Sequence, residues 1–418
     1  MNPVSFTFRE SAGTAKSKRT VVRNATFISS HHLTCATFNT VFGLRMMNEL
    51  YRVQGVESLY SPSLLLFKDL IRQNIASAVK MTGGPAKLRP HVKTHKTREI
   101  TQLEREAGIT KQKCATIAEA EMLAQCGVPD VLLAYPLVGP NIGRFLSLMR
   151  TFPATKFSTL IDHPRTASAM SEAATKAGQT VEVLLDVNVG QNRTGIAAGP
   201  EAIELYAMMA KLPGLRAIGL HVYDGHNHQE GIVDRESAVL ALVKPVFDMR
   251  AELEKRGFVI EKMVCGGTPT FPVWAKMDFP GLECSPGTFV LHDTGYGHKF
   301  TDMSGFTPAA VLLTRVVSKP LPNRLTLDLG NKAVAADPPL AKRAFILGIS
   351  EFQIVVHNEE HLVIETPDAS KYEPGDHLFA LPGHVCPTCA LHREVYVVEG
   401  GRVVGTWTVA SRDRVLSV

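Results

Sequence analysis

The sequence predicts an α/β protein: a (β/α)8 TIM-type barrel followed by an all-β C-terminal domain. Short apolar runs alternate with helix-period segments from Ser61 to about Asp293, as in a barrel whose strands and helices take turns along the chain. After Gly305 the apolar runs become β-branched and alternating, and turns containing Gly or Pro separate them. These two patterns predict a barrel over residues 46–300 and a β-domain over 301–418.

Eight strand-then-helix units over about 230 residues fit a closed barrel better than an open sheet. The expected barrel strands are 87–93, 113–116, 131–135, 157–162, 181–188, 217–223, 261–266 and 281–285. The expected helices are 63–80, 117–126, 141–150, 165–177, 200–211 and 233–256. In the β-domain, strands are expected at 310–317, 324–328, 345–356, 361–365, 395–398 and 403–409.

The composition excludes several classes of function. With 45% apolar and 20% charged residues the chain can bury a sizeable core, and no apolar run approaches the roughly 20 residues that span a bilayer. The net charge of +5 comes from residues 1–45, which hold six Lys or Arg against one acid, so we expect neither a nucleic-acid nor a membrane partner. The seven scattered cysteines argue against a disulfide framework and favour a reducing cytoplasm.

Residues 1–45 are weakly patterned and rich in Ser, Thr and Arg. They could be a transit-like segment, a disordered tail, or an extension upstream of a true start at Met46 or Met47. We favour the last interpretation, because strong patterning begins only near Tyr51.

Lys93 lies at the end of the first expected strand, where an α/β barrel places its chemistry. Its neighbours in the sequence include the cationic groups His91, His95 and Lys96, which would favour the free amine that Schiff-base chemistry requires. Taken alone, this stretch could equally be a solvated basic loop.

Two turns, at the ends of strands seven and eight, predict a phosphate site. The first contains Gly266, Gly267 and Thr268, whose backbone N–H groups and hydroxyl are suitable donors to an anion. The second spans 285–288, and barrels commonly bind phosphate between these two strands. A lone Gly-Gly-Thr would more often be a tight turn, so the pair of turns favours the phosphate cradle.

Candidate donors and bases follow strands five and six. Arg193, in a loop bracketed by glycines, could donate to a phenolate or carboxylate, or be an ordinary surface arginine. His226 and His228 come soon after strand six, and histidines this dense at a strand end indicate acid–base chemistry. An isolated histidine would more often be packed or exposed.

His384 and Cys386 form the strongest signal in the β-domain. They are two residues apart, so on extended backbone both side chains would point the same way, and imidazole plus thiolate suits Zn²⁺. Two protein ligands would leave positions open for water and substrate, as in a catalytic site. The alternatives are a closed structural zinc site that adds Cys389 and His392, or a turn with buried thiols and no metal.

Three runs together resemble one enzyme family: His91–Lys96 (HVKTHK), Gly266–Thr270 (GGTPT) and His384–Cys386 (HVC). In this order they are similar to the D-threonine aldolase and D-serine dehydratase family, fold-type III pyridoxal-phosphate enzymes related to alanine racemase. The resemblance covers about 51–411. The triple match is specific to the family, though not to one member.

The resemblance implies a pyridoxal phosphate held as a Schiff base by Lys93, and a divalent metal, zinc or manganese, held by His384 and Cys386. The other implied contacts, to the cofactor's phosphate, phenolic oxygen and ring, are Gly266, Gly267, Thr268, Arg193 and Tyr223. It also implies a small D-amino acid substrate, and a homodimer in which the β-domain of one subunit completes the partner's barrel site.

Two lyase reactions of D-3-hydroxy amino acids fit this resemblance. Aldol cleavage of D-threonine to glycine and acetaldehyde needs a base for the β-hydroxyl proton, and His226 and His228 supply one, with His226 favoured. Dehydration of D-serine to pyruvate and ammonia is the alternative, because zinc-dependent dehydratases of this family carry a cysteine where Cys386 stands. A non-catalytic pyridoxal-phosphate-binding homeostasis protein is the second alternative, although it would need neither the β-domain nor the metal pair. A racemase would need a second base, and no tyrosine of the β-domain stands in a recognisable motif for one.

Overall fold

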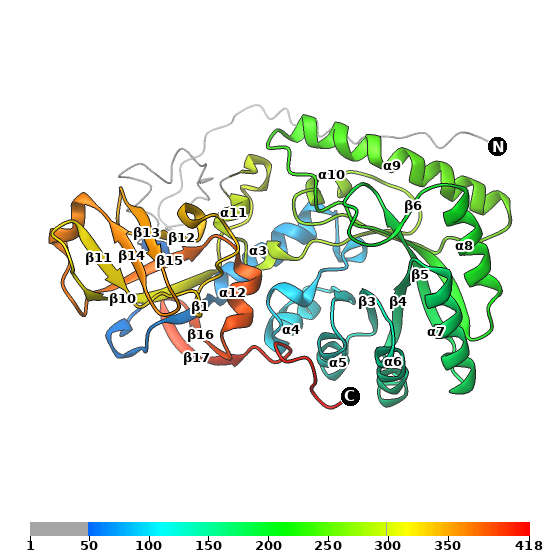
Figure 1. Cartoon of the computed structure of the whole chain (residues 1–418), viewed down its shortest axis with the longest axis horizontal. Helices are drawn as coiled ribbons and strands as arrows, with labels where there is room; N and C mark the ends of the chain where they lie inside the picture. The colour runs from blue at the N-terminus through cyan, green and yellow to red at the C-terminus, as the bar shows by residue number, and fades with distance from the viewer. Residues whose placement is uncertain (1–48, 298) are drawn as a thin grey trace, which may run out of the picture.

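The computed structural model describes residues 49–297 and 299–418 and consists of a barrel packed beside a β-rich domain (Figure 1). The N-terminal extension predicted over 1–45 lies outside the described residues. In the described part of the chain, no helix combines the length and apolar character needed to cross a bilayer.

The barrel sheet is parallel, with strand order β2–β3–β4–β5–β7–β8–β9, and the short β6 pairs with β5. These strands are β2 (Lys111–Cys114), β3 (Asp130–Pro136), β4 (Lys156–Ile161), β5 (Val181–Asn188), β6 (Ile196–Ala197), β7 (Leu215–Val222), β8 (Lys262–Cys265) and β9 (Leu282–Cys284). Seven of the eight expected barrel strands are therefore confirmed to within a few residues.

The first expected strand, 87–93, is present only as two single parallel bridges. Leu88 bridges to Cys284 of β9, and His91 bridges to Lys113 of β2. This segment therefore lies between the first and last strands of the sheet and closes the barrel.

Helices surround the barrel on its outer side (Figure 1). They are α3 (Lys68–Met81), α4 (Arg98–Glu106), α5 (Ile117–Gln125), α6 (Pro140–Thr151), α7 (Pro164–Lys176), α8 (Pro200–Lys211) and α9 (Ile232–Lys255), with short α10 (Phe271–Trp274) and α11 (Thr294–Gly297) near the strand ends. Proline at the first position of α6, α7 and α8 presets the helical backbone angle, which explains why these starts were predictable. Helix α4 was not expected, because its sequence is mostly polar.

The helix expected over 63–80 is wrong in its first turn. Residues Ser63–Phe67 form a strand, β1, and only then does α3 begin. β1 pairs antiparallel with β10 (Ala310–Ser318) and parallel with β16 (Glu394–Glu399), so it lies inside the C-terminal sheet (Figure 1). An apolar run of this length does not distinguish a buried strand from a helix, and the partner strands decide.

The sheet of the β-domain has the order β13–β14–β11–β10–β1–β16–β17, with β15 paired to β10 and β12. Its remaining strands are β11 (Arg324–Leu327), β12 (Ala344–Ile346), β13 (Gln353–His357), β14 (Leu362–Glu365), β15 (His377–Pro382) and β17 (Arg402–Thr408). The single strand expected over 345–356 is two strands, and β15 was missed. The short helix α12 (Val385–Leu391) faces the barrel.

The interior of the barrel is layered, as the alternation of inward-facing residues requires. The lowest layer is ionic and contains Arg89, Lys111, Asp130, Lys262 and Glu283. The middle layer is apolar and contains Leu132, Leu160, Leu184, Ile218 and Val264. Above it, toward the C-terminal strand ends, lie the polar groups of His91, Lys113, Asp186 and His221. The apolar layer is therefore a floor between the ionic layer and the polar groups above.

Arg89 should contribute strongly to stability, because its buried guanidinium pairs with both Asp130 and Glu283. Replacing it by methionine leaves the buried Glu283 and the partly buried Asp130 without this partner, and we expect the free energy of unfolding to fall by about 3–5 kcal/mol. Urea unfolding followed by circular dichroism measures this. Arg72→Ala, which removes an exposed ion pair with Glu399, is the control and should change stability by less than about 1 kcal/mol. Equal effects of the two variants would contradict the role given to Arg89.

Candidate active site

Lys93 stands at the barrel rim, as its place at a strand end predicted. It lies in a single 3₁₀ turn, Val92–Thr94, directly after the bridge that His91 makes to β2. Its side chain is partly buried, and its Nζ atom lies 6.0 Å from the ring centroid of Tyr223. The 3₁₀ turn thus directs the amine across the open end of the barrel.

Three cationic groups surround the Tyr223 ring, which follows β7. Lys93 Nζ is 6.0 Å, Lys113 Nζ 5.6 Å and Arg193 Cζ 4.9 Å from its centroid. The structure therefore brings together Lys93, Tyr223 and Arg193, which the sequence placed on three different strand ends. Lys113 was missed. The signal for it was a lysine at the start of the expected strand 113–116, two residues after Lys111.

The glycine turn after β8 packs closely against two aromatic rings. Gly266 has a φ of +80°, and a Cβ there would lie 2.6 Å from Cδ1 of Trp274. A Cβ on Gly267 would lie 3.0 Å from Cε2 of Tyr223. The two glycines thus give room to the two rings, because any side chain would displace them.

The backbone donors expected for a phosphate are already engaged. Gly266 N–H donates to Val222 O at 2.9 Å, and Gly267 N–H donates to Thr270 Oγ1 at 3.2 Å. Thr268 Oγ1 accepts from the N–H groups of 287 and 288, at 3.1 and 3.0 Å. Thr268 therefore ties the turn after β8 to the turn after β9, and the two turns form one preorganised corner.

His226 and His228 are exposed in the loop that follows Tyr223. His226 Nε2 would lie 3.3 Å from a Cβ on Gly190, so it packs against the loop after β5. Partial burial, then the charges of Lys299 and His226, lower the pKa of His228. In the described part of the chain no hydrogen bond joins either histidine to Lys93, so both belong to the rim of the site.

A buried pair, Asp186 and His221, was not singled out from the sequence. His221 Nδ1 is 2.7 Å from Asp186 Oδ1, and His221 Nε2 is buried without a hydrogen-bond partner among the described residues. Burial lowers the pKa of His221 although Asp186 opposes this, which favours the neutral imidazole. A neutral ring with one unsatisfied buried nitrogen is prepared for a ligand in the polar layer.

His384 and Cys386 meet, but not on extended backbone as expected. His384 precedes α12 and Cys386 lies in its first turn. His384 Nδ1 is 2.5 Å from Asp337 Oδ2. Burial opposes the charge on the ring, but Cys386 and then Asp337 outweigh it and raise the pKa of His384 to about 9. His384 in turn lowers the pKa of Cys386 against the effect of burial, so each group favours the charged form of the other.

Cys386 joins the β-domain to the barrel beside Lys93. Its Sγ atom is 3.2 Å from Thr94 Oγ1 and 3.6 Å from Thr288 Oγ1. Since Thr94 follows Lys93 directly, one chain by itself brings the lysine and the His384–Cys386 pair together.

The closed four-ligand zinc site is not formed. His392 Nε2 lies 2.8 Å from Ala333 O, and burial raises the pKa of Cys389. Within 49–297 and 299–418, no group of three or more His, Cys, Asp or Glu side chains is arranged to hold a metal ion. His384 and Cys386 are therefore suited only to an open site, in which other ligands complete the shell.

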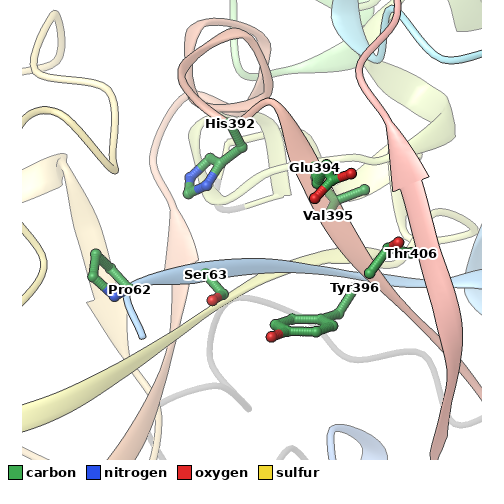
Figure 2. Close-up of a pocket in the computed structure, with 7 residues that line it drawn as sticks. All are labelled: Pro62, Ser63, His392, Glu394, Val395, Tyr396 and Thr406. Atoms are coloured by element: carbon green, nitrogen blue, oxygen red, sulfur yellow. The ribbon is translucent and has the colours of Figure 1, made fainter. Parts of the chain in front are cut away.

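A separate hollow lies in the β-domain, between β1, β16, β17 and the end of α12 (Figure 2). Its volume is about 160 Å³. It is lined by Pro62, Ser63, His392, Glu394, Val395, Tyr396 and Thr406. None of the residues around Tyr223 or Cys386 lines it, so it is distinct from the site at the barrel rim.

Comparison with known proteins agrees with this geometry. Residues 68–291 match the family described as alanine racemase, N-terminal domain, and 309–398 match the putative serine dehydratase domain. The chain is 28% identical over 333 residues to D-threonine aldolase of Arthrobacter sp., covering 78% of this chain and 85% of that protein. It is 27% identical over 371 residues to 3-hydroxy-D-aspartate aldolase of Paracoccus denitrificans, covering 85% and 93%. The crystal structure of D-threonine aldolase from Filomicrobium marinum superimposes with a TM-score of 0.78 at 25% identity, covering 85% of this chain and 97% of that one.

The first of these family matches spans more than half of the chain, and the second spans most of the β-domain. The order of the domains, the lysine at the first strand end and the His384–Cys386 pair agree with the resemblance drawn from the sequence. The chain therefore belongs to the D-threonine aldolase and D-serine dehydratase family of fold-type III pyridoxal-phosphate enzymes, and it is a lyase of that family.

Proposed function

We propose that this lyase uses pyridoxal phosphate and a divalent metal to cleave D-3-hydroxy amino acids, with D-threonine converted to glycine and acetaldehyde. The observation that carries the proposal is the contact between Cys386 and Thr94, which puts a candidate metal pair beside the candidate cofactor lysine, Lys93. The exposed histidines 226 and 228 lie on the same rim and supply the base that aldol cleavage requires.

The residues at the rim fit pyridoxal phosphate. Lys93 offers an amine, and Tyr223 offers a ring face that the bare Cα of Gly267 leaves accessible. The unsatisfied Nε2 of His221 offers a buried polar contact, and Arg193 offers a cation over the Tyr223 ring. When bound, pyridoxal phosphate would supply an electron sink for the amino acid's α-carbon.

In this proposal the chain's own groups have separate tasks. Lys93 would hold the cofactor through its amine. Asp186 keeps the His221 imidazole in one orientation through Nδ1, so that Nε2 faces the ligand space. Thr268 holds the two turns together, which keeps the corner that would receive the phosphate preorganised.

The pair His384 and Cys386 fits a divalent ion, zinc or manganese. Thiolate and imidazole are ordinary zinc ligands, and the bond from Asp337 to Nδ1 leaves Nε2 of His384 for the metal. When bound, the ion would act as a Lewis acid toward the substrate's β-hydroxyl, and an imidazole of the rim would accept the hydroxyl proton.

Dehydration of D-serine to pyruvate and ammonia is the second candidate. The observation that favours it is Cys386, a thiolate rather than an oxygen ligand, together with the serine-dehydratase description that residues 309–398 match. The family also suggests a homodimer in the cytoplasm, which we include in the proposal. Because Cys386 reaches Thr94 within one chain, this metal pair does not depend on a partner's β-domain.

Product analysis separates the two reactions. With pyridoxal phosphate, Zn²⁺ or Mn²⁺ and D-threonine, we expect glycine and acetaldehyde in equal amounts, measured by amino-acid analysis and an aldehyde-coupled assay. Ammonia and 2-oxobutanoate instead would replace the aldolase by the dehydratase. L-threonine is the matched control and should give neither set of products.

The proton acceptor can be identified by single substitutions at the rim. We expect His226→Ala to lower kcat for D-threonine about 10²–10⁴-fold, the range for loss of a general base, and His228→Ala to have a smaller effect. His361→Ala, an exposed histidine of the β-domain, is the control and should leave kcat unchanged. If both rim variants keep the normal kcat, the base lies elsewhere and the aldolase argument loses its main support.

Metal content tests the pair in the β-domain. Cys386→Ala should purify with far less Zn²⁺ or Mn²⁺ per chain, measured by mass spectrometry of the elements, and should lose activity that a chelator also removes from the normal protein. Cys386→Asp, which restores an anionic ligand, should recover part of the metal. Cys126→Ser changes a thiol in another part of the fold and should keep the normal metal content. Undiminished metal in Cys386→Ala would rule out this cysteine as a ligand.

A further inference from the structure

Lys113 lies inside the barrel, directly beside the strand that carries Lys93. Its N–H donates to Pro90 O at 2.7 Å, and its backbone is in register with Leu132 of the apolar floor. The side chain is only 2% exposed and extends upward, so that Nζ is 5.6 Å from the Tyr223 ring centroid. Two lysine amines thus face the same ring, one from the rim and one from the interior.

Lys113 has no ion-pair partner among the described residues, in contrast to Lys111 on the same strand. Lys111 Nζ is 2.9 Å from Glu283 Oε1, below the apolar floor. The acid nearest to Lys113 in the polar layer, Asp186, is instead hydrogen-bonded to His221. A buried amine without a carboxylate is costly unless an anionic ligand arrives.

The charges that face Lys113 come from several elements. They are Lys93, His91 and Arg89 on the closing segment, Asp186 and Arg193 after or on β5, His221 on β7 and Cys265 on β8. Cations outnumber acids in this set. Burial is the largest cause that lowers the pKa of Lys113, and the charge of Lys93 is the next; together they lower it to about 7. An anionic ligand beside Lys113 would offset these cations and favour its charged form.

We propose that Lys113 is a second lysine of the cofactor site, a positioning residue whose amine faces the bound cofactor from the barrel interior. Its charge opposes protonation of the nitrogen that joins Lys93 to the cofactor, and so favours the free-base form of that nitrogen. The inference rests on the proposed role of Lys93. The proposed role of Lys113 is separate from the reaction steps. Lys113 would neither bind the substrate nor transfer a proton to or from it.

A pH titration of the cofactor's visible absorbance measures this effect without turnover, because that absorbance depends on whether the linking nitrogen is protonated. Lys113→Met removes the charge while keeping the length of the side chain. A nearby cation destabilises the protonated form, so its loss should move the midpoint of the absorbance change upward by about one pH unit. Lys113→Arg, which keeps the charge, should have its midpoint at or below that of the normal protein.

Lys111→Met is the matched control, because it removes a lysine from the same strand but below the apolar floor. It should lower stability, since Glu283 loses a partner, and leave the midpoint unchanged. If Lys113→Met does not fold, Lys113→Gln is the substitute, with the same expected shift. A midpoint that stays within about 0.2 pH units in the folded, cofactor-loaded Met or Gln variant, or that moves downward, overturns the proposal.

Lys93→Ala distinguishes this inference from the proposed function. If that variant keeps the normal visible absorbance, Lys93 does not hold the cofactor and the proposed function fails. If the absorbance is lost in Lys93→Ala while Lys113→Met titrates normally, only the role of Lys113 fails.

Discussion

The closure of the barrel by residues 88–91 is the constraint from which the geometry of the site follows. Arg89 N–H donates to Cys284 O at 2.8 Å, and His91 N–H donates to Pro286 O at 2.9 Å, which joins this segment to the last strand. The bridge to Lys113 joins it to β2 on the other side. Below, the Arg89 guanidinium binds acids from β3 and β9. These contacts to β2, β3 and β9 fix the direction of the segment. It therefore ends at the rim of the barrel, where the following turn carries Lys93.

The second determinant is the attachment of the β-domain to the same end of the barrel. β1 runs within the β-domain sheet and continues directly into the first barrel helix, so the two parts share a continuous element. On the other side, Val385 N–H donates to Asp293 Oδ2 at 3.0 Å, and burial raises the pKa of this carboxyl to about 6. The start of α12 is thereby fixed against the barrel, and Cys386 reaches Thr94. Any reaction that uses both the Lys93 amine and the His384–Cys386 pair depends on this attachment of the β-domain to the barrel.

The interior of the barrel separates two kinds of charge. Below the apolar floor the ionic groups pair with one another, so they contribute to stability. Above the floor, His221 Nε2 lacks a hydrogen-bond partner among the described residues, and Lys113 faces the Tyr223 ring with no carboxylate paired to it there. The apolar layer keeps water and the lower charges away from these groups, so their interaction with an anionic cofactor would be weakly screened. The same strands thus serve stability at one end and ligand binding at the other.

The sequence by itself determined the barrel, most of its element boundaries, and the convergence of Lys93, Tyr223 and Arg193. These features follow from local patterns. Apolar periodicity indicates each strand, and Gly and Pro mark its ends. Parallel strands in a barrel then bring their C-terminal ends to one rim. The tertiary structure alone decided that Ser63–Phe67 is a strand, because its partners lie hundreds of residues away in the chain. It also decided which polar groups were left without partners.

The same limit applies to the site. The helical backbone at Cys386 differs from the extended backbone that the spacing suggested. The contact of Asp337 with His384 and the position of Lys113 could not be read from the sequence, because neither belongs to a pattern of neighbouring residues. Local periodicity determines which face of a strand or helix a side chain lies on. Packing across the barrel determines which charged groups lie next to it.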